Sequence, residues 1–91
     1  PPRLERLGVG MLFLTAERLI FQIRGKSYSL WLKSLGAVWL ERDRFLVLRV
    51  RERFYLFRFL EESLLKWLTY LKLAVKPVEE RYRLRIPMAW D

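Results

Sequence analysis

The sequence predicts a mostly β fold closed by one C-terminal helix, on three observations. Apolar and polar residues alternate in several short segments between residues 9 and 59, which is the period of a strand. After residue 60 the apolar residues recur every three to four positions, which is the period of a helix. Of the 91 residues 53% are hydrophobic, enough to offset the entropy lost on folding. We expect one domain over 1–91, a twisted antiparallel barrel or sandwich of six to seven strands capped by a helix.

The first half of the chain contains a predicted hairpin. Residues 18–24 alternate apolar and polar side chains, and residues 27–32 resume the alternation after Gly25. Glycine takes positive φ without a steric cost, so a tight turn is expected there. Residues 9–15 have the same alternation and are predicted to form a strand before the hairpin.

Three further strands are predicted at residues 36–41, 45–50 and 54–59, separated by short charged turns. Consecutive strands joined by such short turns are expected to be antiparallel neighbours. On this alternation several large apolar side chains fall on the solvent side of the sheet. They are Ile20, Trp31, Trp39, Phe45, Val47, Phe54 and Leu56.

The helix is predicted at about residues 61–75, a segment without glycine or proline. Pro77 is expected to end it, because a proline biases the preceding residue away from helical geometry. Arginines then alternate with apolar residues over 81–86, which predicts a C-terminal extra strand at a sheet edge or an extended arm that reaches a neighbour. The core is therefore expected at about 9–76 and a C-terminal extension at 77–91.

One segment adds a resemblance to these patterns. Residues 10–21 read Gly-Met-Leu-Phe-Leu-Thr-Ala-Glu-Arg-Leu-Ile-Phe. They resemble the signature of GRAM-type members of the pleckstrin-homology (PH) superfold: a glycine, a strand ending in Leu-Thr, then Arg-Leu and an aromatic. Residues 29–38 resemble that family's step into its next strand, residues 55–59 its last barrel strand, and Trp67 the helix tryptophan that plugs one open end. The resemblance spans about residues 10–75.

The resemblance implies a PH-like fold and a non-enzymatic binding module. Two features depart from the family: its seven-stranded barrel begins further upstream than residues 1–7 allow, and the sequence after Val75 has no counterpart, which leaves the strand count open. Some members bind anionic membrane lipids through basic residues in the loops between early strands. That role would fall here to Arg18, Arg24 and Lys26.

The residue types argue against catalysis. Cysteine and histidine are absent, which removes thiolate chemistry, the usual zinc ligands and the commonest general base. Ser63 and Lys66 have the spacing of serine acyl-enzymes but lack the companion motifs. The Gly-Lys-Ser at 25–27 lacks the glycine that a phosphate-binding loop needs at Ile20. We expect no catalytic residue, cofactor or metal.

Composition also bears on location and partners. The longest uncharged stretch, residues 7–16, is shorter than the roughly 17 to 25 residues of a membrane-spanning helix, and no basic segment precedes it, so we expect a cytoplasmic protein. Asparagine is missing and Gln22 is the one glutamine, a bias typical of heat-adapted proteins. Lysine and arginine number 18 against 10 acidic residues, a net charge of +8 that attracts anionic partners.

The leading functional prediction is a protein–protein interaction or assembly domain. Apolar residues on the outer side of the sheet would pack on another protein or on another copy of the chain, so self-association is expected as one form of it, and arginines at the rim would select an acidic partner. The alternative is peripheral binding to anionic membrane lipids, and a second alternative is nucleic-acid binding, with arginines on phosphates and tryptophans stacked on bases. The predicted interaction surface is Trp31, Trp39, Phe45, Phe54, Leu56, Arg49, Arg58, Arg81, Arg83 and Arg85.

Overall fold

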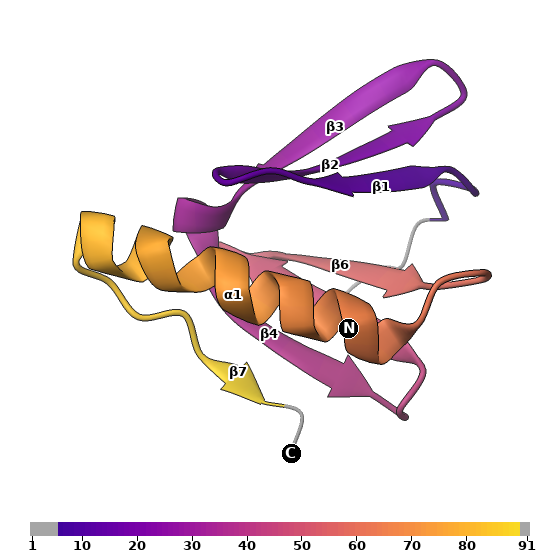
Figure 1. Cartoon of the computed structure of the whole chain (residues 1–91). Coiled ribbons are helices and arrows are strands. Elements are labelled where there is room, and N and C mark those ends of the chain that lie inside the picture. The colour runs from indigo at the N-terminus through magenta and orange to yellow at the C-terminus, as the bar shows by residue number, and fades with distance from the viewer. Residues whose placement is uncertain (1–5, 90–91) are drawn as a thin grey trace.

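The computed structural model describes residues 6–89, which form two β-sheets and one long helix (Figure 1). The predicted domain also includes residues 1–5 and 90–91, which lie outside the described residues. The mostly β class is confirmed, as a sandwich of a three-stranded and a four-stranded sheet capped by a helix, and not as a closed barrel. The elements are β1 (Met11–Leu14), β2 (Arg18–Ile23), β3 (Lys26–Trp31), the 3-10 turn η1 (Leu32–Ser34), β4 (Leu35–Glu41), β5 (Phe45–Val50), β6 (Arg53–Arg58), α1 (Leu64–Tyr82) and β7 (Met88–Ala89).

The first sheet has the antiparallel order β1-β2-β3. Its hairpin closes through Arg24 and Gly25, whose φ angles of 50° and 78° suit the two-residue turn that matches the twist of the flanking strands. Just before β1, Gly10 passes so close to β2 that a Cβ would overlap the carbonyl oxygen of Gln22. Glycine at this position therefore lets the two strands meet.

The second sheet has the order β6-β5-β4-β7, and η1 carries the chain into it from β3. β4, β5 and β6 are antiparallel neighbours, as the short turns predicted. β7 pairs with β4 in parallel, and the Val38 amide donates to the Pro87 carbonyl at 2.8 Å beside this pair. The tail thus adds a strand to the edge of the second sheet.

The core lies between the two sheets and against α1, which passes across them in Figure 1. Phe21 of β2 contacts Phe57 of β6, with ring centroids 5.5 Å apart. Trp67 of α1 stacks on Phe59 at 5.5 Å, and its indole nitrogen donates to Glu62 at 2.8 Å. The buried helix residues recur every three to four positions, as the pattern predicted. They are Trp67, Leu68, Leu71, Val75 and Val78.

The prediction that Pro77 ends the helix is wrong, because α1 continues to Tyr82. Proline removes a hydrogen bond to the carbonyl four residues earlier, here that of Leu73. Pro77 is exposed and Leu73 is 61% exposed, so water can reach the freed carbonyl. Val78, only 6% exposed, meanwhile keeps the last turns against the core. The helix start was also placed early, since Ser63 caps it by accepting the Lys66 amide at 3.4 Å.

The predicted strand at 81–86 is also wrong, because α1 occupies its first residues and the chain turns directly after the helix. Arg83 ends the helix in the left-handed conformation, with φ 51° and ψ 51°. Glu79 then fixes the turn: its carbonyl accepts the Leu84 amide at 3.1 Å and its carboxylate accepts the Ile86 amide at 2.8 Å. The C-terminal extra strand exists, but it is β7, two residues long and later than predicted. The boundary expected at residue 77 falls inside α1.

Candidate interaction surface

The side of the four-stranded sheet that faces away from the core carries the predicted apolar residues. We call it the outer face. Strand register arranges its side chains in three rows across β6, β5 and β4. The rows are Arg58–Phe45–Glu41, Leu56–Val47–Trp39 and Phe54–Arg49–Ala37, and Ala89 of β7 extends the middle row beside Trp39.

The central strand β5 is unusual because three consecutive residues are buried. Leu46 and Leu48 are 0% exposed and belong to the core, whereas Val47 is 2% exposed and points to the outer face, outside the core cluster. An antiparallel strand with one solvated face normally alternates buried and exposed residues. Val47 is flanked by Trp39 and Leu56, so neighbouring side chains already cover it.

Around Val47 the outer face keeps large apolar side chains in contact with water. Phe54 is 43% exposed and Leu56 is 39% exposed, while Trp39 and Phe45 are half-buried. Trp39 and Phe54 meet edge to face across β5, with ring centroids 5.9 Å apart. The sequence prediction that apolar side chains gather on the solvent side of the sheet therefore holds for these four residues.

Three charged residues border this apolar band. The Arg49 guanidinium lies over Gly36, where an added Cβ would come within 2.6 Å of it, and it donates to the Arg51 carbonyl at 3.1 Å. Glu41 accepts the indole N–H of Trp39 at 3.1 Å. Within residues 6–89, neither Glu41 nor Arg58 has an oppositely charged side chain within 4.0 Å.

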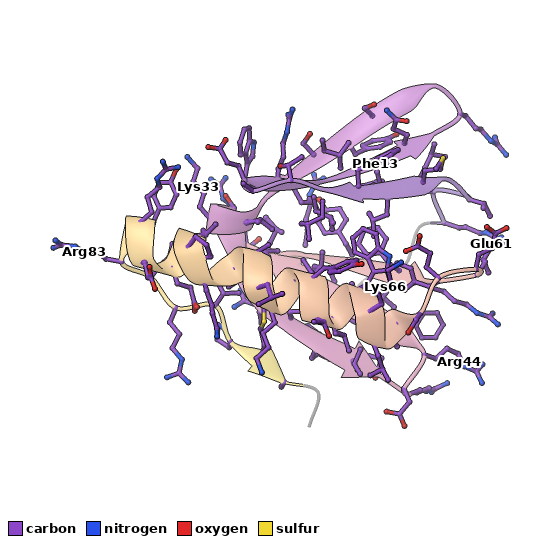
Figure 2. The ribbon with its side chains drawn as sticks, viewed as in Figure 1. Phe13, Lys33, Arg44, Glu61, Lys66 and Arg83 are labelled. Carbon is purple, nitrogen blue, oxygen red and sulfur yellow. The ribbon has the colours of Figure 1, made fainter. Side chains whose placement is uncertain are left out.

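Trp31 lies on the other sheet, so the structure corrects the prediction that it shares a surface with Trp39. It is 42% exposed at the end of β3, with the Arg18 guanidinium 5.4 Å and the Lys33 ammonium 5.9 Å from its ring centre. The Lys33 ammonium is also 5.3 Å from the ring of Tyr82, and Figure 2 shows Lys33 beside the last turns of α1. These cation–π contacts join the end of the helix to the first sheet.

The three tail arginines do not line up as predicted, because their segment is not a strand. Arg81 is in the last helical turn and pairs with Glu17 at 3.5 Å. Arg83 is the helix cap, and Figure 2 shows it pointing away from the molecule. Arg85 is exposed in the segment between α1 and β7. None of the three is on a strand of the outer face.

The predicted anion-binding residues are also separated. Arg24 and Lys26 lie on either side of Gly25 at the tip of the first hairpin. Arg18 is at the opposite end of β2, where it donates to the Ser29 hydroxyl at 3.4 Å. Of the three predicted residues, only Arg24 and Lys26 therefore lie together, at the tip of the hairpin.

Sequence reasoning placed Glu41 at the end of the predicted strand 36–41 but did not include it in the predicted interaction surface. Its signal was present, because Glu41 continues the alternation of Ala37 and Trp39. It also missed Phe13, 41% exposed on β1, and a shallow groove beside that strand. The groove is lined by Leu14, Thr15, Ala16, Tyr70, Leu73 and Ala74.

The comparisons with known proteins give no match among family models, curated proteins or solved structures. Over residues 6–89, the structure holds no helix with the length and apolarity to cross a bilayer. The same residues contain no group of three acidic, histidine or cysteine side chains placed to hold a metal ion.

Proposed function

We propose that this chain is a non-enzymatic protein-interaction module that binds a protein partner through the outer face of its four-stranded sheet. The observation that carries the proposal is the band of Trp39, Phe45, Phe54 and Leu56 around Val47, in which Phe54 and Leu56 keep 43% and 39% of their surface in water. Burying a large apolar side chain gains about 1.5 to 3 kcal/mol, so covering this band is favourable.

The chemistry of the band suits a protein interface. Aromatic residues and arginine are enriched where proteins bind each other, and the residues that contribute most lie near the centre within a more polar rim. Here Leu56, Val47 and Trp39 form the middle row, and Trp39 contacts Phe54 edge to face. The charged residues Arg58, Glu41 and Arg49 lie in the two flanking rows. A partner that presents an apolar surface would cover the outer face, which no layer of the protomer covers.

A GRAM-type or PH-like relationship is part of this proposal. A three-stranded and a four-stranded sheet closed by a helix support it, as does Trp67, which is 7% exposed and stacked on Phe59.

Peripheral binding to anionic lipids is the second candidate, and the tip of the first hairpin favours it. Arg24 and Lys26 are exposed there, and Met11, 64% exposed, is paired with Gln22 close to the same tip. Two cations contribute only about 2 kcal/mol of membrane attraction at roughly 1 kcal/mol each, which is weak. Flotation with vesicles containing phosphatidylserine tests it: binding that is lost in Arg24→Glu supports the lipid role.

The interaction proposal is tested by site-specific photo-crosslinking in living cells. A photoreactive phenylalanine analogue at position 54 is compared with the same analogue at Leu65, which is 72% exposed on α1 and off the outer face. We expect discrete protein adducts from position 54 and none of the same mass from position 65, with loss of the adducts on Leu56→Asp. Equal adduct patterns at the two positions would overturn the proposal.

A further inference from the structure

We infer that the partner of the outer face is a second copy of this chain, packed face to face about a two-fold axis that runs parallel to β5; this rests on the function proposed above. The inference comes from the order of charges and side-chain sizes in the three rows of the outer face. Each row is centred on β5 and has unlike residues on the flanking strands β4 and β6.

A rotation of 180° about β5 leaves each row in place and lays β6 of one copy over β4 of the other. Arg58 then faces the partner's Glu41, and Glu41 faces the partner's Arg58, so one contact occurs twice by symmetry. Both residues lack an ion partner within 4.0 Å among the described residues, so each is available for this pairing.

Side-chain size follows the same rule as charge. The rotation places Phe54 over the partner's Ala37, a large residue over a small one, and Leu56 over the partner's Trp39. Val47 lies on the axis. Two packed sheets are usually about 10 Å apart and cross at about 30°. The crossing displaces facing residues at the ends of a row from each other, and the long side chains of arginine and glutamate can span that displacement.

The alternative two-fold axis, perpendicular to the strands, does not satisfy the charges. It would place Arg58 over the partner's Phe54 and Glu41 over the partner's Ala37, and both charges would lose water without gaining an ion partner. In the preferred arrangement Arg49 of one copy faces Arg49 of the other. Its guanidinium, however, is turned toward β4 over Gly36 and donates to the Arg51 carbonyl. The axis along β5 is therefore the one that the row pattern selects.

Charge exchange tests this arrangement. Arg58→Glu gives a copy with glutamate at both positions, and Glu41→Arg gives a copy with arginine at both. Each variant alone places like charges opposite each other twice, and we expect its self-association to weaken roughly tenfold or more. An equimolar mixture of the two variants restores opposite charges at both contacts, so we expect heterodimers of wild-type affinity in sedimentation velocity and native mass spectrometry.

Matched controls change the same charges away from the outer face. Arg53→Glu lies on β6 and Glu52→Arg lies in the turn before it, and neither residue belongs to a row of the outer face. We expect both controls to dimerise like the wild type. Circular dichroism and thermal unfolding of every variant show whether it is folded. Restored pairing in the mixture is itself evidence that both charge variants are folded, because an unfolded variant could not form the heterodimer.

The outcomes separate the two proposals. A wild-type chain that stays monomeric at about 1 mM, where even a binding energy near −4 kcal/mol would show, overturns the second-copy inference. If position 54 still crosslinks to another protein, the proposed function survives that result. A dimer that the two control variants weaken as much as Arg58→Glu, or single variants that do not pair when mixed, overturns the axis along β5.

Discussion

Removing the two most exposed apolar side chains of the outer face should weaken dimerisation by an amount that the structure bounds. Phe54 keeps 43% and Leu56 keeps 39% of its surface exposed in the protomer. If full burial of such a side chain gains about 1.5 to 3 kcal/mol, the exposed shares together represent about 1.2 to 2.5 kcal/mol per copy. Both copies lose them, so Phe54→Ala/Leu56→Ala should weaken the dimer by about 2.4 to 5 kcal/mol, between roughly 60-fold and several thousand-fold in Kd.

The assay is sedimentation equilibrium over a concentration series at fixed salt. The control is Leu65→Ala, which removes a leucine 72% exposed on α1 and should leave Kd within about twofold. Unfolding of each variant in urea shows whether the protomer is intact. A double variant that dimerises like the wild type, or a control that weakens the dimer equally, would refute the reasoning that these exposed surfaces are buried between copies.

Three predictions concern the protomer and are measured by urea unfolding and hydrogen exchange. Gly10→Ala should cost more than about 1 kcal/mol, because its Cβ would overlap a backbone carbonyl, whereas at Gly36 the added methyl displaces only the end of an arginine and Gly36→Ala should cost less; equal costs would contradict this. Leu71→Ala, at 0% exposure, should cost about 2 to 5 kcal/mol, and a loss under 1 would show that the core contact is misassigned. Glu79→Ala removes the acceptor of a tail amide at 2.8 Å and should cost about 1 to 3 kcal/mol with faster exchange after residue 83, so unchanged exchange there would be the contrary result.

Strand positions were predictable because the alternation and the turns act locally. β5 begins and ends where the sequence predicted, at Phe45 and Val50, since charged turns border a run of apolar and β-branched residues. The helix start was predicted to within a few residues from the change of apolar period after residue 60, and Ser63 fixes the observed start as the capping residue. These features depend on neighbours in sequence, which a single chain reveals.

The helix end was not predictable from Pro77 alone. The cost of a proline inside a helix depends on whether the freed carbonyl faces water, and that is a property of the packed structure. The apolar period did contain a signal, since Val78 follows Val75 and Leu71 at helical spacing. In this helix the apolar period indicates the end of the helix better than the proline does.

The candidate surface was predicted in part. Alternation placed Trp39, Phe45, Phe54 and Leu56 on the solvent side of one sheet, but it could not show that the chain crosses to a second sheet after Trp31. The separation of Arg18 from Arg24 and Lys26 follows from strand geometry alone. A strand rises about 3.3 Å per residue, so six residues place Arg18 about 20 Å from the hairpin tip.

The strongest argument for a covered outer face lies in the sequence of β5 itself. A strand with one wet face needs apolar residues only at alternate positions, yet Phe45, Leu46, Val47 and Leu48 are all apolar, a run typical of strands covered on both faces. The first sheet and α1 cover one face, while the other has only the side chains of β4 and β6 over Val47. The sequence of β5 is therefore that of a strand with a covering layer on each face, but the protomer covers only one face. Because Arg58 and Glu41 lie at the ends of one row of that uncovered face, the proposed second copy would supply a third layer whose apolar and charged residues both match.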